Sequence, residues 1–279
     1  MPNPTIAGGG GVGGLTNTTG GLNDRGEVVR DAFYAQRLFA DRVRVLVGRM
    51  DISDHVGGYR LQNINSAFSN RAFSALVTAA FSGYGLGAVA TVRPIHPLYV
   101  TFGAGNAYGC TTQIAVGRFF NDFDLFYTTE AGITREFQGL GLGRDAVTYW
   151  FVNERNDPEI GREQGFTLVA EQDLGETFHA FACYLQADDA LERIKKSVQV
   201  DLGIKGLLGS PRNFSAAAFS CGGSSTDGLR DEKIVEIFHR WQLTRFTQFS
   251  VGGQLIVDLG NAPEDSAVGV FTARFRVES

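Results

Sequence analysis

The sequence lacks the cysteine pairs and histidine clusters that hold metal ions. Its three cysteines, Cys110, Cys183 and Cys221, are far apart and form no CxxC motif. An odd number of cysteines also cannot complete a disulfide framework within one chain. We therefore expect buried or wall-facing thiols, no metal site and no cofactor.

An excess of positive charge is also absent. The chain has 25 Lys and Arg against 30 Asp and Glu, a net charge of −5. Binding to nucleic acid depends on neutralising phosphates with basic side chains, so we expect no nucleic acid partner. The first residues show no basic stretch followed by an apolar one, so no signal peptide is visible. The expectation is either a cytosolic protein or a mature, recombinant or N-terminally shortened chain.

Catalytic motifs are missing as well. No GxSxG, HExxH or carboxylate motif accompanies the four histidines, which are His55, His96, His179 and His239. We predict that the protein is not an enzyme. An outer-membrane hydrolase built on serine, histidine and an acid remains the enzymatic alternative.

Glycine and phenylalanine are abundant, with 36 and 22 residues, and short alternating runs fill the chain. Alternation of apolar and polar side chains is typical of half-buried strands, and turn residues between such runs indicate hairpins. We predict about thirteen antiparallel strands, within residues 28–39, 43–51, 83–92, 98–105, 123–135, 146–153, 165–173, 178–186, 197–205, 214–221, 231–243, 248–259 and 271–277.

The hairpin in residues 231–259 shows the alternation most clearly. One parity of its first strand is apolar, with Val235, Ile237, Trp241 and Leu243. The other parity is polar, with Glu232, Glu236, Arg240 and Gln242. Because successive side chains of a strand point to opposite faces, the hairpin has one apolar and one polar face. A soluble sandwich would show the same pattern, so alternation alone leaves open which face meets water.

No linker or composition break divides the chain. Residues 1–27 read as a Gly-rich N-terminal loop segment, and residues 28–279 read as one β-barrel domain. Residues 53–71 form a long polar connection, and residues 188–195 have a short helix-like charge pattern. Residues 72–92 contain no charge. We nevertheless reject a transmembrane helix there, because Gly83, Gly85 and Gly87 recur at the spacing of a strand.

The lengths of the strands and of their connections favour a protein that spans a membrane. Strands of about 9–11 residues can cross a bilayer as a barrel, and outer-membrane barrels alternate short turns with longer loops. The polar parity would then line the lumen, and Trp150 and Trp241 would anchor the wall at the lipid interface. A soluble or adhesive closed β-barrel without transport remains the alternative.

Several motifs resemble the carbohydrate-selective porins of the OprB type. They are residues 165–172 (GFTLVAEQ), 181–184 (FACY), 206–213 (GLLGSPRN) and 47–51 (VGRMD) followed by Asn65 and Phe68. A late signature of that family is similar to Glu232, Glu236, Phe238, Leu243-Thr244, Gln254 and Pro263. The resemblance covers roughly residues 11–279, and the order and spacing of the motifs make it specific.

The resemblance implies an all-β, transmembrane, antiparallel up-and-down β-barrel of about 13–16 strands, with short periplasmic turns and longer outer loops. It implies an outer-membrane location and passive diffusion of small sugars. Three departures stand out: Cys183 replaces an arginine of the family, residues 277–279 lack a terminal aromatic, and thirteen strands fall short of sixteen. We therefore expect either an N-terminally shortened member or a reduced relative whose Gly-rich start does not fully replace the missing strands, with a signal peptide that is not present in this chain.

A sugar channel needs aromatic surfaces for sugar faces and charged or amide groups for hydroxyls. We predict that the pore-lining, sugar-binding residues are those on the polar parity of the strands: Arg30, Arg44, Tyr99, Glu130, Glu171, Glu236, Arg240, Gln242, Gln254, Arg274 and Arg276. The alternative is that these side chains pair with one another and brace the wall. The expected partners are small carbohydrates and outer-membrane lipid, and the sequence leaves open whether the barrels form homotrimers.

Overall fold

The computed structural model describes residues 12–19, 29–81, 83–107, 124–156, 159–188, 193–262 and 266–278. Within these residues, thirteen strands form one antiparallel sheet in which each strand pairs with the sheet strands before and after it in the chain. A separate two-stranded ribbon, β7 (Arg155–Asn156) and β8 (Glu159–Ile160), interrupts the connection between β6 and β9. The strands of the large sheet are β1 (Ala32–Leu38), β2 (Val43–Asp51), β3 (Tyr84–Val92), β4 (Leu98–Asn106), β5 (Leu125–Phe137), β6 (Gly141–Val152), β9 (Glu163–Leu174), β10 (Phe178–Ala187), β11 (Ile194–Lys205), β12 (Phe214–Ser224), β13 (Glu232–Gln242), β14 (Thr247–Val257) and β15 (Ala267–Val277).

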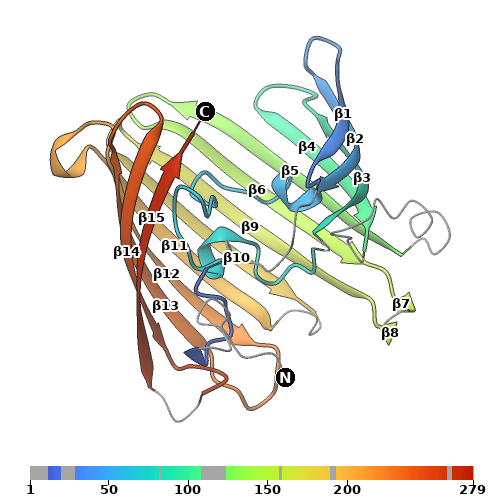
Figure 1. Cartoon of the computed structure of the whole chain (residues 1–279). Coiled ribbons are helices and arrows are strands. Elements are labelled where there is room, and N and C mark those ends of the chain that lie inside the picture. The colour runs from blue at the N-terminus through green and yellow to red at the C-terminus, as the bar shows by residue number, and fades with distance from the viewer. Residues whose placement is uncertain are drawn as a thin grey trace.

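The sheet curves around a central space, with β1 and β15 as its two edges (Figure 1). Over the described residues these two edge strands are not paired with each other. The predicted up-and-down antiparallel architecture is therefore confirmed, as is the number of strands, and its described part forms an open, strongly curved wall.

The connections at the two ends of the sheet differ in length. At one end, here called the short-turn end, strands are joined by residues 39–42, 138–140 and 243–246. At the opposite end, here called the long-loop end, connections include residues 52–83 and 225–231. The alternation of short and longer connections agrees with the sequence prediction.

The connection between β2 and β3, residues 52–83, lies on the concave side of the sheet (Figure 1) and is called the inner segment below. It contains a 3₁₀ turn, η1 (Ile52–Asp54), and a one-turn helix, α2 (Arg71–Ser74). Asn70 caps α2 by accepting a hydrogen bond from the Ala72 N–H at 2.9 Å. The sequence predicted a connection here but placed its end at residue 71, whereas it continues to β3.

Aromatic side chains fix the inner segment to the wall. Phe68 packs edge-to-face on Phe238 of β13 with ring centroids 5.0 Å apart. Tyr59 stacks on Phe181 of β10 at 3.6 Å. Apolar burial of this kind drives the segment against the sheet.

No helix among the described residues is long and apolar enough to cross a membrane.

The convex face of the sheet is apolar. Exposed side chains in the middle of the strands include Val47, Phe102, Val147, Leu168, Val200, Ile237 and Leu255. Aromatic pairs lie nearer the margins, with Tyr127 beside Phe151 toward the long-loop end and Trp241 beside Phe249 toward the short-turn end. An apolar band between aromatic girdles is typical of the lipid-facing surface of outer-membrane barrels.

Trp150 corrects one expectation. It was expected at the lipid interface, but its side chain is fully buried on the concave side and stacks on Phe126. It shares parity with Thr148, which also points inward. The expected helical pattern of residues 188–195 falls largely on residues 189–192, outside the described residues, and Ile194 already begins β11.

Candidate functional site

Four glutamates of the concave face bind the backbone of segments that lie inside the wall. Glu236 of β13 accepts hydrogen bonds from the Ser69 and Asn70 N–H groups at 2.7 and 2.9 Å. Glu232, on the same strand, accepts from the Leu15 and Thr16 N–H groups at 2.5 and 3.1 Å. Both glutamates are only 1% exposed. A buried carboxylate needs such donors, because it would otherwise lose its solvation without compensation.

The other two glutamates hold the first half of the inner segment. Glu171 of β9 accepts from the Arg60 N–H at 3.2 Å, and the Arg60 guanidinium forms an ion pair with Asp173 at 2.8 Å. Glu130 of β5 accepts from the Gly57 N–H. The contact of Gly57 with Glu130 spans 73 positions of the chain, and that of Arg60 with Glu171 spans 111. Together with Glu236, they fix the inner segment at three points along its length.

Polar residues of the last strands complete this attachment. The Arg240 guanidinium donates to the Ser66 carbonyl at 2.6 Å, and that of Arg274 donates to the Ile64 and Ala67 carbonyls. The Gln254 amide donates to the Thr18 carbonyl and to Ser69 Oγ, both at 2.8 Å. Here the concave face meets protein backbone rather than open space.

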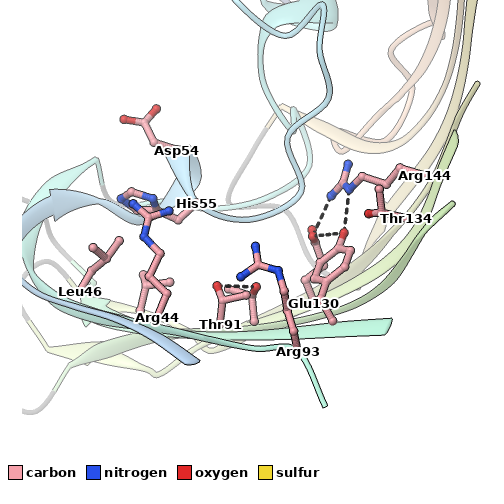
Figure 2. A pocket seen from close by; sticks show the side chains of 12 residues that line it. Arg44, Leu46, Asp54, His55, Thr91, Arg93, Glu130, Thr134 and Arg144 are labelled. Atoms are coloured by element: carbon pink, nitrogen blue, oxygen red, sulfur yellow. Dashed lines mark hydrogen bonds and ion pairs between the residues drawn. The ribbon is translucent and has the colours of Figure 1, made fainter. Parts of the chain in front are cut away.

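A polar cleft of about 320 Å³ lies on the other side of the concave face, beside β2 to β6 (Figure 2). Its lining residues are Arg44, Leu46, Asp54, His55, Val89, Thr91, Arg93, Tyr99, Thr101, Glu130, Thr134 and Arg144. Most of them come from strands, so their positions follow from the sheet register. The volume falls within the range of roughly 300–1,000 Å³ that is common for ligand sites.

The floor of the cleft is a network of three side chains. The Tyr99 hydroxyl donates to Glu130 at 2.7 Å and accepts from Arg144 Nε, also at 2.7 Å. Arg144 donates a second hydrogen bond to Glu130 at 2.7 Å, as Figure 2 shows. Thr148 donates to the other Glu130 oxygen at 2.9 Å. Charge-assisted bonds of this kind are short and hold the side chains in one arrangement.

The wall of the cleft carries hydroxyls and cations. Thr91 and Thr101 face each other across β3 and β4, with their Oγ1 atoms 3.0 Å apart. Arg44 is paired in register with Thr91, and Arg93, the first residue after β3, keeps the parity of Thr91 and lines the cleft. Register and alternation therefore place both arginines on the concave side.

The inner segment forms the opposite side of the cleft through Asp54 and His55. Burial raises the pKa of the Asp54 carboxyl, and the positive charge of Arg30 opposes that change. Burial lowers the pKa of His55, and the nearby Arg44 guanidinium lowers it further. His55 is therefore neutral at pH 7.

A second cavity of about 440 Å³ lies along the inner segment. It is lined by residues that include Asp51, Ser53, Gly58, Arg60 and Arg71. Asp54 borders both this cavity and the cleft. The two polar spaces therefore adjoin at one side chain.

The structure divides the predicted pore residues into three groups. Arg44, Tyr99 and Glu130 line the cleft. A second group binds the inner segment and consists of Glu171, Glu236, Arg240, Gln254 and Arg274. Glu130 also binds this segment, through its second carboxylate oxygen. Gln242 and Arg276 lie at the short-turn end, where Gln242 bonds the Thr244 carbonyl and Arg276 forms an ion pair with Glu278. Pairing between predicted residues, the alternative role, is seen for Tyr99 with Glu130, and the unpredicted Arg144 joins them.

Arg30 corrects a further expectation. It was assigned to the first strand, but β1 begins at Ala32 and Arg30 precedes it. Its guanidinium forms an ion pair with Asp54 of the inner segment. The residue therefore borders the site through its partner rather than as part of the wall.

Sequence reasoning missed several residues of the cleft. Arg144 was outside the predicted strand, because that strand was started at residue 146 whereas β6 begins at Gly141. Arg93 was assigned to the turn between β3 and β4, where the structure also places it, but its position in the lining of the cleft was not foreseen. Extending the strand of β6 backwards by alternation would have found Arg144. Nothing in the sequence pointed to Asp54 and His55 on the inner segment.

Comparisons with known proteins agree with the architecture. No protein-family model and no curated protein matches the sequence. The structure is similar to the high-pH structure of Pseudomonas putida OprB, with a TM-score of 0.77 and 15% identity over 95% of this chain and 76% of that one. It is also similar to the low-pH structure of the same protein, with a TM-score of 0.60 and 15% identity over 89% of this chain and 66% of that one. The chain therefore shares the fold of OprB over nearly all of its length, as the sequence motifs implied.

Proposed function

We propose that the protein is a porin of the bacterial outer membrane through which small carbohydrates diffuse. The observation that carries this proposal is a polar cleft on the concave side of an antiparallel wall whose convex side is apolar. Such a wall suits a bilayer, because each strand from β2 to β14 in the large sheet has a hydrogen-bonded neighbour on both sides, and only β1 and β15 have one neighbour each over the described residues. The OprB fold supports the same assignment.

The cleft has the chemistry that sugar hydroxyls require. Tyr99, Glu130 and Arg144 hold donors and acceptors in fixed positions, and Thr91 and Thr101 add two hydroxyls. Each hydroxyl of a sugar can donate and accept, so a mixed set of this kind fits it better than it fits a simple ion. Binding through a few groups on an open wall stays weak enough for release, as conduction requires.

The proposed path follows β2 to β6. On that side the cleft adjoins the second cavity at Asp54. On the side of β12 to β14, Phe68 and Phe73 of the inner segment pack with Phe238 and Ile256, and this core fills the space. Solutes would therefore pass beside the inner segment, along the wall that carries Arg44 and Tyr99.

Outer-membrane lipid is the proposed surrounding of the convex face, and association into homotrimers remains a proposal for that face. Catalysis is not proposed. His239 lies 2.7 Å from Ser215 Oγ, but on the apolar outer side. A soluble or adhesive barrel would leave the many exposed aliphatic side chains of that side in water, which argues for the membrane.

Reconstitution into planar bilayers tests the function. Wild-type protein should give conductance steps that glucose or maltose partly blocks. Thr101→Val, which removes a cleft hydroxyl without changing side-chain size, should weaken the block several-fold. Thr129→Val on the convex side of β5 is the matched control and should leave it unchanged. Absence of conductance, or conductance without any sugar effect, would refute the proposal.

A further inference from the structure

We propose that Arg44 and Arg93 form an anion subsite in the cleft, which makes the channel prefer monosaccharides that carry a carboxylate, such as uronates, over neutral sugars. This inference rests on the proposed sugar-channel function and specifies its substrate class. It depends on which charges of the cleft are already paired, on where the unpaired ones lie, and on what surrounds them.

The carboxylates of the cleft are compensated by other residues. Glu130 forms an ion pair with Arg144 at 2.7 Å and accepts from Tyr99 and Thr148 as well. Asp54 forms an ion pair with Arg30, which lies outside the cleft lining. Both negative charges of the lining therefore have a cation of their own.

Arg44 and Arg93 have no such partner in the part of the chain that the structure describes. Among the residues that the structure describes, neither guanidinium forms an ion pair or a side-chain hydrogen bond, whereas Arg144 on the same wall has several. Both side chains are exposed, so their guanidinium groups are open to solvent and to a solute in the cleft. The lining thus carries positive charge in excess, in a chain whose net charge is −5.

The histidine of the cleft does not change this balance. The pKa of His55 lies below its usual value because of burial and of Arg44, so His55 is neutral at pH 7. The excess charge therefore belongs to arginines, which keep their protons at every pH that an outer membrane meets.

The two arginines stand close to the groups that would bind the sugar ring. Figure 2 shows Arg44 and Arg93 on either side of Thr91, with both guanidinium groups rising from the wall into the same space. Arg44, Thr91, Thr101 and Glu130 follow one another in register across β2 to β5. Arg93 lies two positions beyond Thr91, on the side of Tyr99. A ring whose hydroxyls meet the threonines and Tyr99 would place a ring carboxylate near the arginines. Guanidinium groups bind carboxylates through paired hydrogen bonds, which gives direction as well as strength.

The test compares three solutes in planar bilayers: glucose, glucuronate and acetate. Glucuronate should block wild-type conductance at a concentration about fivefold to tenfold lower than glucose, because one charge-assisted contact of about 1–1.4 kcal/mol gives that ratio. Acetate should block weakly, because it lacks the hydroxyls. In the double variant Arg44→Gln, Arg93→Gln, glucose and glucuronate should block at equal concentrations, so that the ratio of the two blocking concentrations falls to about one.

Arg245→Gln is the matched control. Arg245 lies in the turn between β13 and β14 at the same end of the sheet, outside the cleft, so its replacement removes the same type of charge. It should leave the preference for glucuronate unchanged. Circular dichroism of each variant checks that the barrel has folded.

The outcomes separate this inference from the function on which it rests. If neither sugar blocks the current, the sugar channel itself is wrong. If glucose and glucuronate block wild-type protein equally, or if acetate competes as strongly as glucuronate, only the sugar-acid preference is wrong. If the preference survives in the double variant, Arg44 and Arg93 do not form the subsite.

Discussion

Glu236 of β13 accepts a hydrogen bond from the backbone N–H of Ser69 at 2.7 Å, across 167 positions of the chain. The glutamate lies on the polar parity of its strand, and the serine lies just before the cap of α2. This contact, with those of Glu130 and Glu171, holds the inner segment against the wall. The carboxylates bind backbone N–H groups of the segment, and the Ser69 hydroxyl adds a side-chain hydrogen bond to Glu236 at 2.8 Å.

Loss of this attachment should open the interior. Glu236→Ala removes the acceptor for Ser69 and Asn70, and leaves two buried N–H groups without a partner. We expect the free energy of unfolding to fall by about 1–3 kcal/mol. We also expect single-channel conductance to rise, because the segment is released along part of its length. Urea unfolding in vesicles and bilayer recordings measure the two effects.

Glu176→Ala is the control for that variant, because Glu176 is exposed in the turn between β9 and β10. It should change neither stability nor conductance. An unchanged conductance in Glu236→Ala, despite lower stability, would mean that the inner segment does not limit the passage.

Cysteine accessibility should separate three environments. In a background without the three native cysteines, a water-soluble thiol reagent should label Arg44→Cys in the cleft rapidly. Ile237→Cys, which is 56% exposed on the convex face, should stay unlabelled in a bilayer because lipid covers it. Gln254→Cys should react slowly, because Gln254 is 4% exposed beneath Ser69 and Asn70. Rapid labelling at position 237 would reverse the assignment of the faces.

A charge on the convex face should destabilise the protein in lipid. Val200 lies in the middle of β11, with its side chain 43% exposed on the apolar side. Val200→Arg should lower the free energy of unfolding by about 2–4 kcal/mol, the range for a cation near the bilayer midplane. Thr226→Arg in the connection between β12 and β13 is the control and should cost almost nothing. Equal stability of the two variants in vesicles would argue against a membrane at this face.

The pKa of His55 should respond to the positive charge of Arg44 in the cleft. Burial is the larger cause of its lowered pKa and Arg44 the next, so Arg44→Gln should raise the pKa of His55 but leave it below the usual value. As pH falls below about 6.5, the unfolded chain takes up a proton that folded His55 does not, so wild-type stability decreases with acid. This decrease should be smaller in Arg44→Gln. Titration of the histidine ring signals by NMR measures the pKa, and an unchanged value would place Arg44 too far away to matter.

The faces of the strands follow from the sequence alone. Glu236 and Gln254 were predicted on one side and Val235 and Leu255 on the other, and the structure places the first pair inward and the second outward. Alternation is a local property of an extended backbone, so it can be recognised in the sequence without knowing which strands pair with each other. Arg144 was missed because the start of β6 was placed at residue 146 rather than at Gly141. Trp150 lay within the predicted strand but was assigned to the lipid interface against its parity with Thr148.

The contents of the concave side depend on the tertiary structure. Nothing local tells Tyr99, which faces the cleft, from Gln254, which the inner segment covers. That difference arises where Phe68 and Tyr59 pack on strands far along the chain. The sequence by itself determined an antiparallel wall with one polar and one apolar face, because side-chain direction is set within each strand. Only the tertiary structure decided which polar side chains hold the inner segment and which remain open to a solute, because that choice is made by contacts between residues more than a hundred positions apart.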